Sequence, residues 1–161
     1  MIKEMTIEDF VPHNIKYGFH GEEIPIGIDD ITLSVITLDI SGHYPDGSQG
    51  ARTGEFLRGV SVFLREVFSL DALVIDLREL DYRWGDNLLR VAFPQNLETS
   101  VRDRDSWIGY KIIGSQKNKD ALYGLFCDFG KSSGIKKIYT SVDDAIQDIV
   151  IAGKELYKDS V

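Results

Sequence analysis

The sequence predicts a single α/β domain with a mixed, mostly parallel sheet and about four helices. The first observation is the length of 161 residues, which suits one domain with its own hydrophobic core. The second is a composition of 43% hydrophobic and 27% charged residues, which is typical of a globular chain. The third is the order of apolar segments, because runs typical of strands alternate with segments of helical periodicity.

The first 30 residues give the weakest structural signal. Prolines and glycines are mixed there with scattered apolar residues, which predicts an irregular acidic segment or a loose hairpin. The α/β domain is therefore expected to span residues 31–161. It begins with a long β-branched run, Ile31–Ile40, which predicts a strand near the centre of the sheet. Turn-forming residues from 41 to 52 predict a loop after it.

A strand, helix, strand unit follows from the next two apolar patterns. Thr53 can cap a helix whose seven apolar side chains fall on one stripe, namely Phe56, Leu57, Val60, Phe63, Leu64, Val67 and Phe68. Ala72–Leu77 is nearly all apolar, as expected for a strand buried on both faces of a parallel sheet. This order implies a right-handed crossover.

The second half of the chain continues the alternation. The predicted elements are a short helix from Gly85 to Pro94, a polar loop at 95–106, a strand at Trp107–Ile113, a helix at Asp120–Phe129 with a left-handed cap at Gly130, an edge strand at Lys137–Thr140, and a last helix capped by Ser141.

Cysteine content and the lack of long apolar runs indicate a cytoplasmic location. Cys127 is the only cysteine, so an intrachain disulfide is impossible. The start of the chain lacks the pattern of a secretory signal, and no apolar run has the length of a membrane span. We therefore expect no membrane association. Cys127 lies beside phenylalanines in a predicted helix, which favours a buried side chain over a nucleophile.

Charge is distributed unevenly along the chain. The net charge is -8, and residues 1–80 hold 14 acidic and 6 basic side chains, whereas residues 81–161 hold 12 of each. An acidic first half argues against nucleic-acid binding and favours a basic protein partner. The candidate contact residues are Glu22, Glu23, Asp29 and Asp30. The alternative is that the acidity serves only to keep the protein soluble.

The sequence contains no pattern typical of a catalytic site or a metal site. His13, His20 and His43 show no metal-ligand spacing with each other or with Cys127, so no metal or other cofactor is expected. The segment Gly114–Lys119 lies where a phosphate loop would lie, between a strand and a helix, but it lacks the second glycine and the Gly-Lys-Ser/Thr ending. We interpret it as a turn. No catalytic residue is predicted.

The most distinctive stretch is Asp76–Asp86, which follows a buried strand. In open α/β sheets, ligands bind beyond the carboxyl ends of the strands. Tyr82, Arg83 and Trp84 are of the types enriched at interface hot spots, so they are candidate partner-binding residues together with Asp86. The alternative is that Tyr82 and Trp84 only cover the edge of the sheet. Asp86 suits a helix cap better than a catalytic acid.

Four segments carry a family resemblance. They are Ala72-Leu-Val-Ile-Asp-Leu77, Trp84-Gly-Asp86, Lys111-Ile-Ile-Gly114 and Ile138-Tyr-Thr-Ser-Val-Asp-Asp-Ala145. In this order the chain resembles STAS domains, the small α/β modules of anti-sigma-factor antagonists and sulfate transporter tails. The resemblance implies their fold and a regulatory, protein-binding role. Gly85 stands near the place of the antagonists' phosphorylatable serine, which puts phosphorylation-dependent switching in doubt.

These observations favour a non-enzymatic protein-binding module of unknown oligomeric state. It would be either an acidic inhibitor of a basic partner, such as a bacterial immunity protein, or a regulator of the antagonist type. The alternative from another class is a hydrolase or lyase of the ClpP/crotonase type, whose buried strand can also read Val-Ile-Asp-Leu-Arg, as at Val74–Arg78. Such enzymes need glycine-rich oxyanion loops, and the observation that would favour them is a deep pocket lined by paired backbone N–H groups.

Overall fold

A computed structural model of the chain describes residues 4–92, 106–131 and 134–158. Its sheet has the strand order β1-β2-β3-β5-β6, with the short β4 pairing the end of β2. The strands span Ile15–Pro25 (β1), Thr32–His43 (β2), Ala72–Asp76 (β3), Leu80–Asp81 (β4), Gly109–Ile113 (β5) and Ile138–Tyr139 (β6). Only the β1–β2 pair is antiparallel, which confirms the predicted mixed, mostly parallel sheet.

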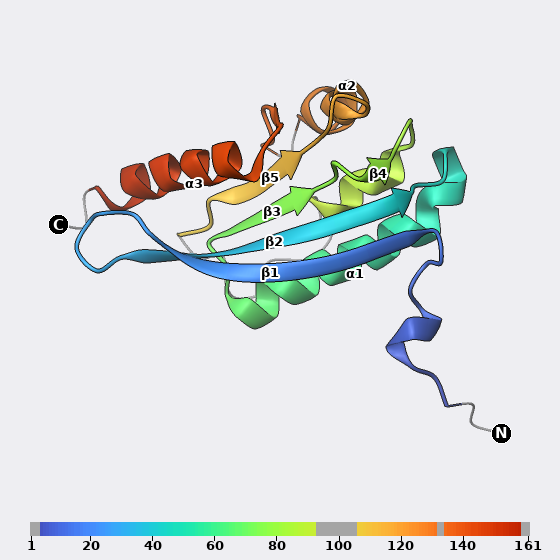
Figure 1. The fold of residues 1–161 in the computed structure, drawn as a ribbon, viewed down its shortest axis with the longest axis horizontal. Helices are drawn as coiled ribbons and strands as arrows, with labels where there is room; N and C mark the ends of the chain where they lie inside the picture. The colour runs from blue at the N-terminus through green and yellow to red at the C-terminus, as the bar shows by residue number, and fades with distance from the viewer. Residues whose placement is uncertain (1–3, 93–105, 132–133, 159–161) are drawn as a thin grey trace.

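The helices lie on both faces of this sheet (Figure 1). They span Ala51–Phe68 (α1), Lys119–Tyr123 (α2) and Val142–Tyr157 (α3). Short 3-10 helices cover Ile7–Asp9 (η1), Gly47–Gly50 (η2) and Asp86–Val91 (η3), and a π-helical turn, η4, continues α2 over Gly124–Phe129. One hydrophobic cluster joins the sheet to α1, η3 and α2, and a second joins it to α3.

Covering on both faces explains why the middle strand was easy to predict. All five residues of β3 are buried, so each must be compatible with a dry environment. The strand between Lys137 and Thr140 is also confirmed, since β6 forms the far edge of the sheet. The N-cap of the last helix is confirmed as well, because the Ser141 hydroxyl accepts a hydrogen bond from the Asp144 N–H at 3.1 Å.

The prediction of an irregular segment at residues 1–30 is wrong for its second half, where the hairpin alternative holds. β1 pairs with β2 along its whole length, from Ile15 opposite Gly42 to Pro25 opposite Thr32. Only two of its eleven residues are buried, Ile15 and Ile24. Apolar alternation in this outermost strand is limited to Ile15, Tyr17 and Phe19, so the strand signal in the sequence is short.

Helix α1 differs from the prediction at its start and in how much of its apolar stripe is buried. It starts at Ala51, and Thr53 is buried in its first turn, where its hydroxyl accepts a hydrogen bond from Asn14 at 3.3 Å instead of capping the helix. The predicted apolar stripe is only partly covered, since Leu57 and Leu64 are buried whereas other members reach solvent. Phe63, Val67 and Phe68 are exposed near the C-terminal end.

The second half of the chain also shows two differences. The helix predicted after Gly85 is the 3-10 helix η3, and the predicted loop at 95–106 lies outside the described residues except for its last one. Gly130 has φ -86°, so the predicted left-handed cap is wrong. A Cβ at Gly130 would lie 2.6 Å from Leu89, so a close contact between η4 and η3 explains the glycine.

Candidate functional site

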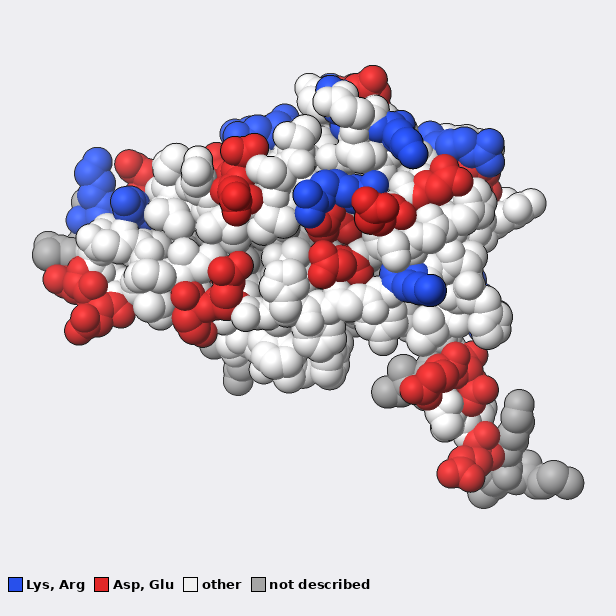
Figure 2. Space-filling view, in the orientation of Figure 1, with Lys and Arg blue, Asp and Glu red and all other residues white. Residues whose placement is uncertain are grey.

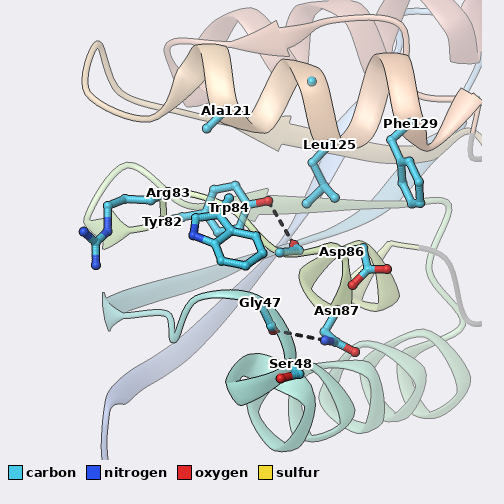
Figure 3. Close-up of a pocket in the computed structure, with 12 residues that line it drawn as sticks. Gly47, Ser48, Tyr82, Arg83, Trp84, Asp86, Asn87, Ala121, Leu125 and Phe129 are labelled. Carbon is cyan, nitrogen blue, oxygen red and sulfur yellow. Dashed lines mark hydrogen bonds between the residues drawn. The ribbon is translucent and has the colours of Figure 1, made fainter.

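A groove of about 550 Å³ lies beyond the carboxyl ends of the parallel strands. One wall is η2, at Gly47 and Ser48, the floor is the segment Tyr82–Asn87, and the other wall is the α2–η4 helix. Figure 3 shows Trp84 at the mouth, between Gly47 and Leu125. The segment singled out in the sequence therefore lines a groove at the edge of the sheet where α/β proteins bind ligands.

Trp84 is held in position although its side chain is 62% exposed. Its ring lies against Gly47, where an added Cβ would come within 2.6 Å of the indole. The Gly47 N–H donates to the Trp84 carbonyl oxygen at 3.3 Å. Gly47 has φ +56° and Gly85 has φ +128°, values that favour glycine. The two glycines thus let two loops meet beneath an exposed indole.

Tyr82 supports the floor of the groove from below. It is only 5% exposed, and its hydroxyl donates to the Gly85 carbonyl oxygen at 3.0 Å. Its ring meets Tyr44 edge-on at 5.8 Å between centroids. Burial, and next the charge of Asp86, raise the pKa of Tyr82 to about 12, so the hydroxyl stays protonated at neutral pH. The Tyr82 side chain therefore fixes the loop.

The charged residues of this loop have separate positions. The Arg83 guanidinium forms an ion pair with Asp46 at 3.0 Å on the rim, where the arginine side chain is 65% exposed. Asp86 is the first residue of η3 and the N-cap position is Gly85, so the prediction of Asp86 as the cap is wrong. The amide of Asn87 donates to the Gly47 carbonyl oxygen at 3.3 Å and connects the floor to the first wall.

The second wall contributes residues that the sequence did not point to. Phe129, at the end of η4, is 69% exposed and lies across the groove from Asn87 (Figure 3). Asn118 is buried before α2, and its Nδ2 donates to the carbonyl oxygens of Leu77 and Leu80, each at 2.8 Å. Its Oδ1 accepts from the Ser115 N–H at 2.9 Å. This residue connects the start of the helical wall to the residues that precede the floor segment.

The Gly114–Lys119 segment is a turn, as interpreted from the sequence. Its N–H groups at 118 and 119 donate to the Ser115 carbonyl oxygen at 3.3 and 2.9 Å. The Lys117 N–H donates to the Ser115 hydroxyl at 3.3 Å. With Ser115 N–H bound to Asn118, the polar groups of this turn are directed at one another.

The acidic candidates lie at the opposite end of the sheet. Glu22 and Glu23 are in the second half of β1, and Asp29 and Asp30 are in the turn that leads to β2. That turn precedes β2, whereas Tyr82–Asp86 follows β4, which pairs with the last residues of β2. Figure 1 shows the turn and β4 at opposite ends of the molecule. The two candidate surfaces are therefore separate, and Figure 2 shows acidic and basic groups interspersed between them.

Chemistry of the groove is limited by its side chains. Among the described residues that line it, Ser48 and Tyr82 carry hydroxyls, and none is a histidine, cysteine or lysine. Within the described parts of the chain, no group of three or more His, Cys, Asp or Glu could hold a metal ion. Cys127 is buried, and burial raises the pKa of its thiol. No helix in the described ranges is long and apolar enough to span a membrane.

The fold is similar to that of a protein of known structure. No protein family and no curated protein matches the sequence. The crystal structure of an anti-sigma factor antagonist from Mycobacterium paratuberculosis is similar over 82% of this chain and 94% of that chain, with a TM-score of 0.46 and 17% identity.

Proposed function

We propose that this chain is a non-enzymatic module that binds a protein partner in the groove beside Trp84. The exposed indole carries the proposal, because a large apolar side chain fixed by its backbone and by Gly47 loses little conformational entropy on binding. Tryptophan is also among the residues that contribute most at interfaces. Phe129 on the facing wall supplies a second exposed aromatic surface.

The partner that fits this groove is a basic protein that inserts an apolar side chain. The groove is lined mainly by apolar atoms, Arg83 on its rim is already paired with Asp46, and Asp86 adds a negative charge. The net charge of -8 attracts a basic protein over a longer range. Opposite charge accelerates such an association more than it strengthens the bound complex.

This binding could serve two functions. The protein would act either as a regulator of the anti-sigma-factor-antagonist type or as an acidic inhibitor of its partner, like an immunity protein. Gly85 replaces the serine in the first case, so binding would be controlled by the partner's abundance and not by phosphorylation at that place. The second case is supported by the acidic turn, where Asp29 and Asp30 lie with Glu22 and Glu23 nearby on β1. Reversing these four charges to lysine separates the two cases when the dissociation rate is measured. The change in net charge should slow association in both cases, whereas dissociation should become faster only if this end is the contact surface.

The test compares Trp84→Ala with a control of equal exposure. Ile151, on α3, is also 62% exposed and lies outside the groove, so Ile151→Ala controls for the loss of an exposed apolar side chain. Proteins retained by the wild-type chain at low salt would be identified and their affinities measured for both variants. We expect a partner whose affinity falls about 30-fold or more with Trp84→Ala and stays unchanged with Ile151→Ala. Equal affinity for Trp84→Ala and the wild type would contradict the proposal.

A further inference from the structure

The outer edge of β1 presents unpaired backbone groups to solvent. β1 is the first strand in the sheet order, and within the described residues no strand pairs with its other side. Just beyond the two ends of β1, the His43 N–H donates to the Asn14 carbonyl oxygen and the Ile26 N–H donates to the Ile31 carbonyl oxygen. The even-numbered residues of β1 therefore direct their backbone N–H and C=O groups toward β2. By the alternation of an antiparallel ladder, Tyr17, Phe19, Gly21 and Glu23 direct their N–H and C=O groups outward.

An apolar surface continues from this edge onto α1. Phe19 on β1 lies 6.1 Å from Phe68 on α1, and Phe68 lies 6.5 Å from Phe63, measured between ring centroids. Phe63 and Val67 are 53% and 57% exposed, and Phe19 and Phe68 are each 45% exposed. Figure 2 shows a broad area without charge below β1, where α1 lies in Figure 1.

The size of this surface exceeds what scattered surface residues would give. With about 200 Å² for a whole phenylalanine side chain, the four residues expose about 350 Å² of apolar area per copy. Patches of that size on a monomer are often interaction sites. A long open edge strand beside such a patch is also a template for pairing with another chain. Strand pairing together with helix contact could supply the roughly 800 Å² per partner of a standard interface.

We propose that the occupant of this surface is a second copy of the chain, paired antiparallel through β1 about a two-fold axis at Phe19. In that register residue numbers of facing positions add up to 38, so Phe19 faces its own copy and Tyr17 faces Gly21. Lys16 then faces Glu22 of the second copy, and Glu22 faces Lys16 in turn, giving two cross-strand ion pairs.

Charge complementarity selects this register over its neighbours. Lys16 is the only basic residue of β1 other than His20, and neither Lys16 nor Glu22 has an ion-pair partner among the described residues. Facing side chains must lie on the same side of the sheet. The sum of the two facing residue numbers therefore changes by two from one possible register to the next. A sum of 36 puts Lys16 opposite His20, and a sum of 40 puts it opposite Ile24. Only the sum of 38 pairs opposite charges.

The same axis brings the two α1 helices together. α1 runs from the end of β2 back to the start of β3. Its Phe63 lies near Phe68, which in turn lies near Phe19. Gly59 is on the same side of the helix, four residues before Phe63, and no atom lies within 4 Å of where its Cβ would be. This position leaves room for a side chain of the facing helix, and Phe63 is placed to contact its counterpart near the axis.

Sedimentation of the purified full chain tests the proposal directly. The wild type should sediment as a dimer of twice the 18.1 kDa chain mass. Phe63→Asp should weaken the dimer about 100-fold, because it places two like charges in an apolar contact, and its circular dichroism should stay native because the side chain is exposed. A wild-type chain that stays monomeric up to its solubility limit would overturn the proposal.

Charge reversal tests the register separately. Lys16→Glu and Glu22→Lys alone should each weaken self-association by about tenfold, and the double variant should restore it. The two single variants mixed together should associate more tightly than either does alone. Single variants that dimerise like the wild type, or a double variant as weak as the singles, would overturn the register.

Cross-linking provides an independent measure of the axis. Facing residues of a hydrogen-bonded antiparallel pair have Cα atoms about 5.5 Å apart, within the range of a disulfide. Phe19→Cys should therefore form a covalent dimer on mild oxidation. Gly21→Cys is the matched control, because two such residues would lie four strand positions apart and both chains retain the buried Cys127. Equal cross-linking by the two variants, or none by Phe19→Cys, would contradict the two-fold axis at Phe19.

Discussion

Replacement of Asn118 by alanine should destabilise the protein by about 3 kcal/mol. Its side chain makes three short hydrogen bonds, two to the carbonyl oxygens of Leu77 and Leu80 at 2.8 Å and one from the Ser115 N–H at 2.9 Å. A buried hydrogen bond contributes about 1 kcal/mol net, and the partners here would lose theirs in a site where Asn118 is 2% exposed. For a chain of this length, that loss lowers the melting temperature by about 6–12 °C.

Urea unfolding followed by circular dichroism measures the effect, with the slope against urea used to confirm that the unfolded state is unchanged. Asn118→Asp is the matched variant, because it keeps the acceptor for Ser115 but loses both donors and buries a carboxylate beside two carbonyl oxygens. We expect it to be at least as destabilising as alanine. A loss below about 1 kcal/mol for Asn118→Ala would refute the role given to these hydrogen bonds. Full stability of Asn118→Asp would show that the donors are dispensable.

Three further outcomes follow from single contacts. Gly47→Ala should cost about 1–3 kcal/mol in urea unfolding, because φ is +56° and the new Cβ would meet Trp84 at 2.6 Å, and it should also shift the tryptophan fluorescence. Tyr44→Phe should cost about 1 kcal/mol by the same assay, because the buried hydroxyl donates to the Gly50 carbonyl oxygen at 2.9 Å. Hydrogen bonds from Lys111 and Tyr139 lower the pKa of Asp148 to about 2, so its ionised form stabilises the fold above the unfolded pKa of 3.8 and the gain is lost as the pH falls toward 2. Asp148→Asn should therefore cost about 1 kcal/mol at pH 6, after allowance for a partly exposed carboxylate, and progressively less between pH 4 and pH 2.

The sequence predicted the strand that is buried on both faces of the sheet and the helix start that is marked by a local capping residue. Ala72–Leu77 is apolar except for Asp76 because helices cover both faces of β3, and Ser141 marks a helix start through a hydrogen bond three residues away. β1 was not assigned as a strand because most of its side chains lie in water and its second half is polar, although β2 follows it closely in the chain. Periodicity is a weak signal for such an exposed edge.

The candidate site was predicted in part for a related reason. Trp84 could be placed near a binding edge because loops after parallel strands gather at one end of the sheet. Phe129 lines the same groove, and Asn118 supports it by bonding to Leu77 and Leu80. Both roles depend on contacts between segments far apart in the chain, which no short pattern records. The distance between Asp29 and Trp84 depends on the direction of the hairpin, so their separation became visible only in three dimensions.

The antiparallel direction of β1 has a consequence for the valency of the assembled protein. The groove lies near the start of β1, since Ile15 faces Gly42 at the end of β2 where β4 pairs. A two-fold axis at Phe19 would then place the two Trp84 grooves at opposite ends of the joined sheets. The two Ile15 positions would be about 27 Å apart along the strands, at about 3.4 Å per residue. A short linear ligand could not bridge them, so avidity would arise only with partners that are themselves paired or long enough to span the dimer.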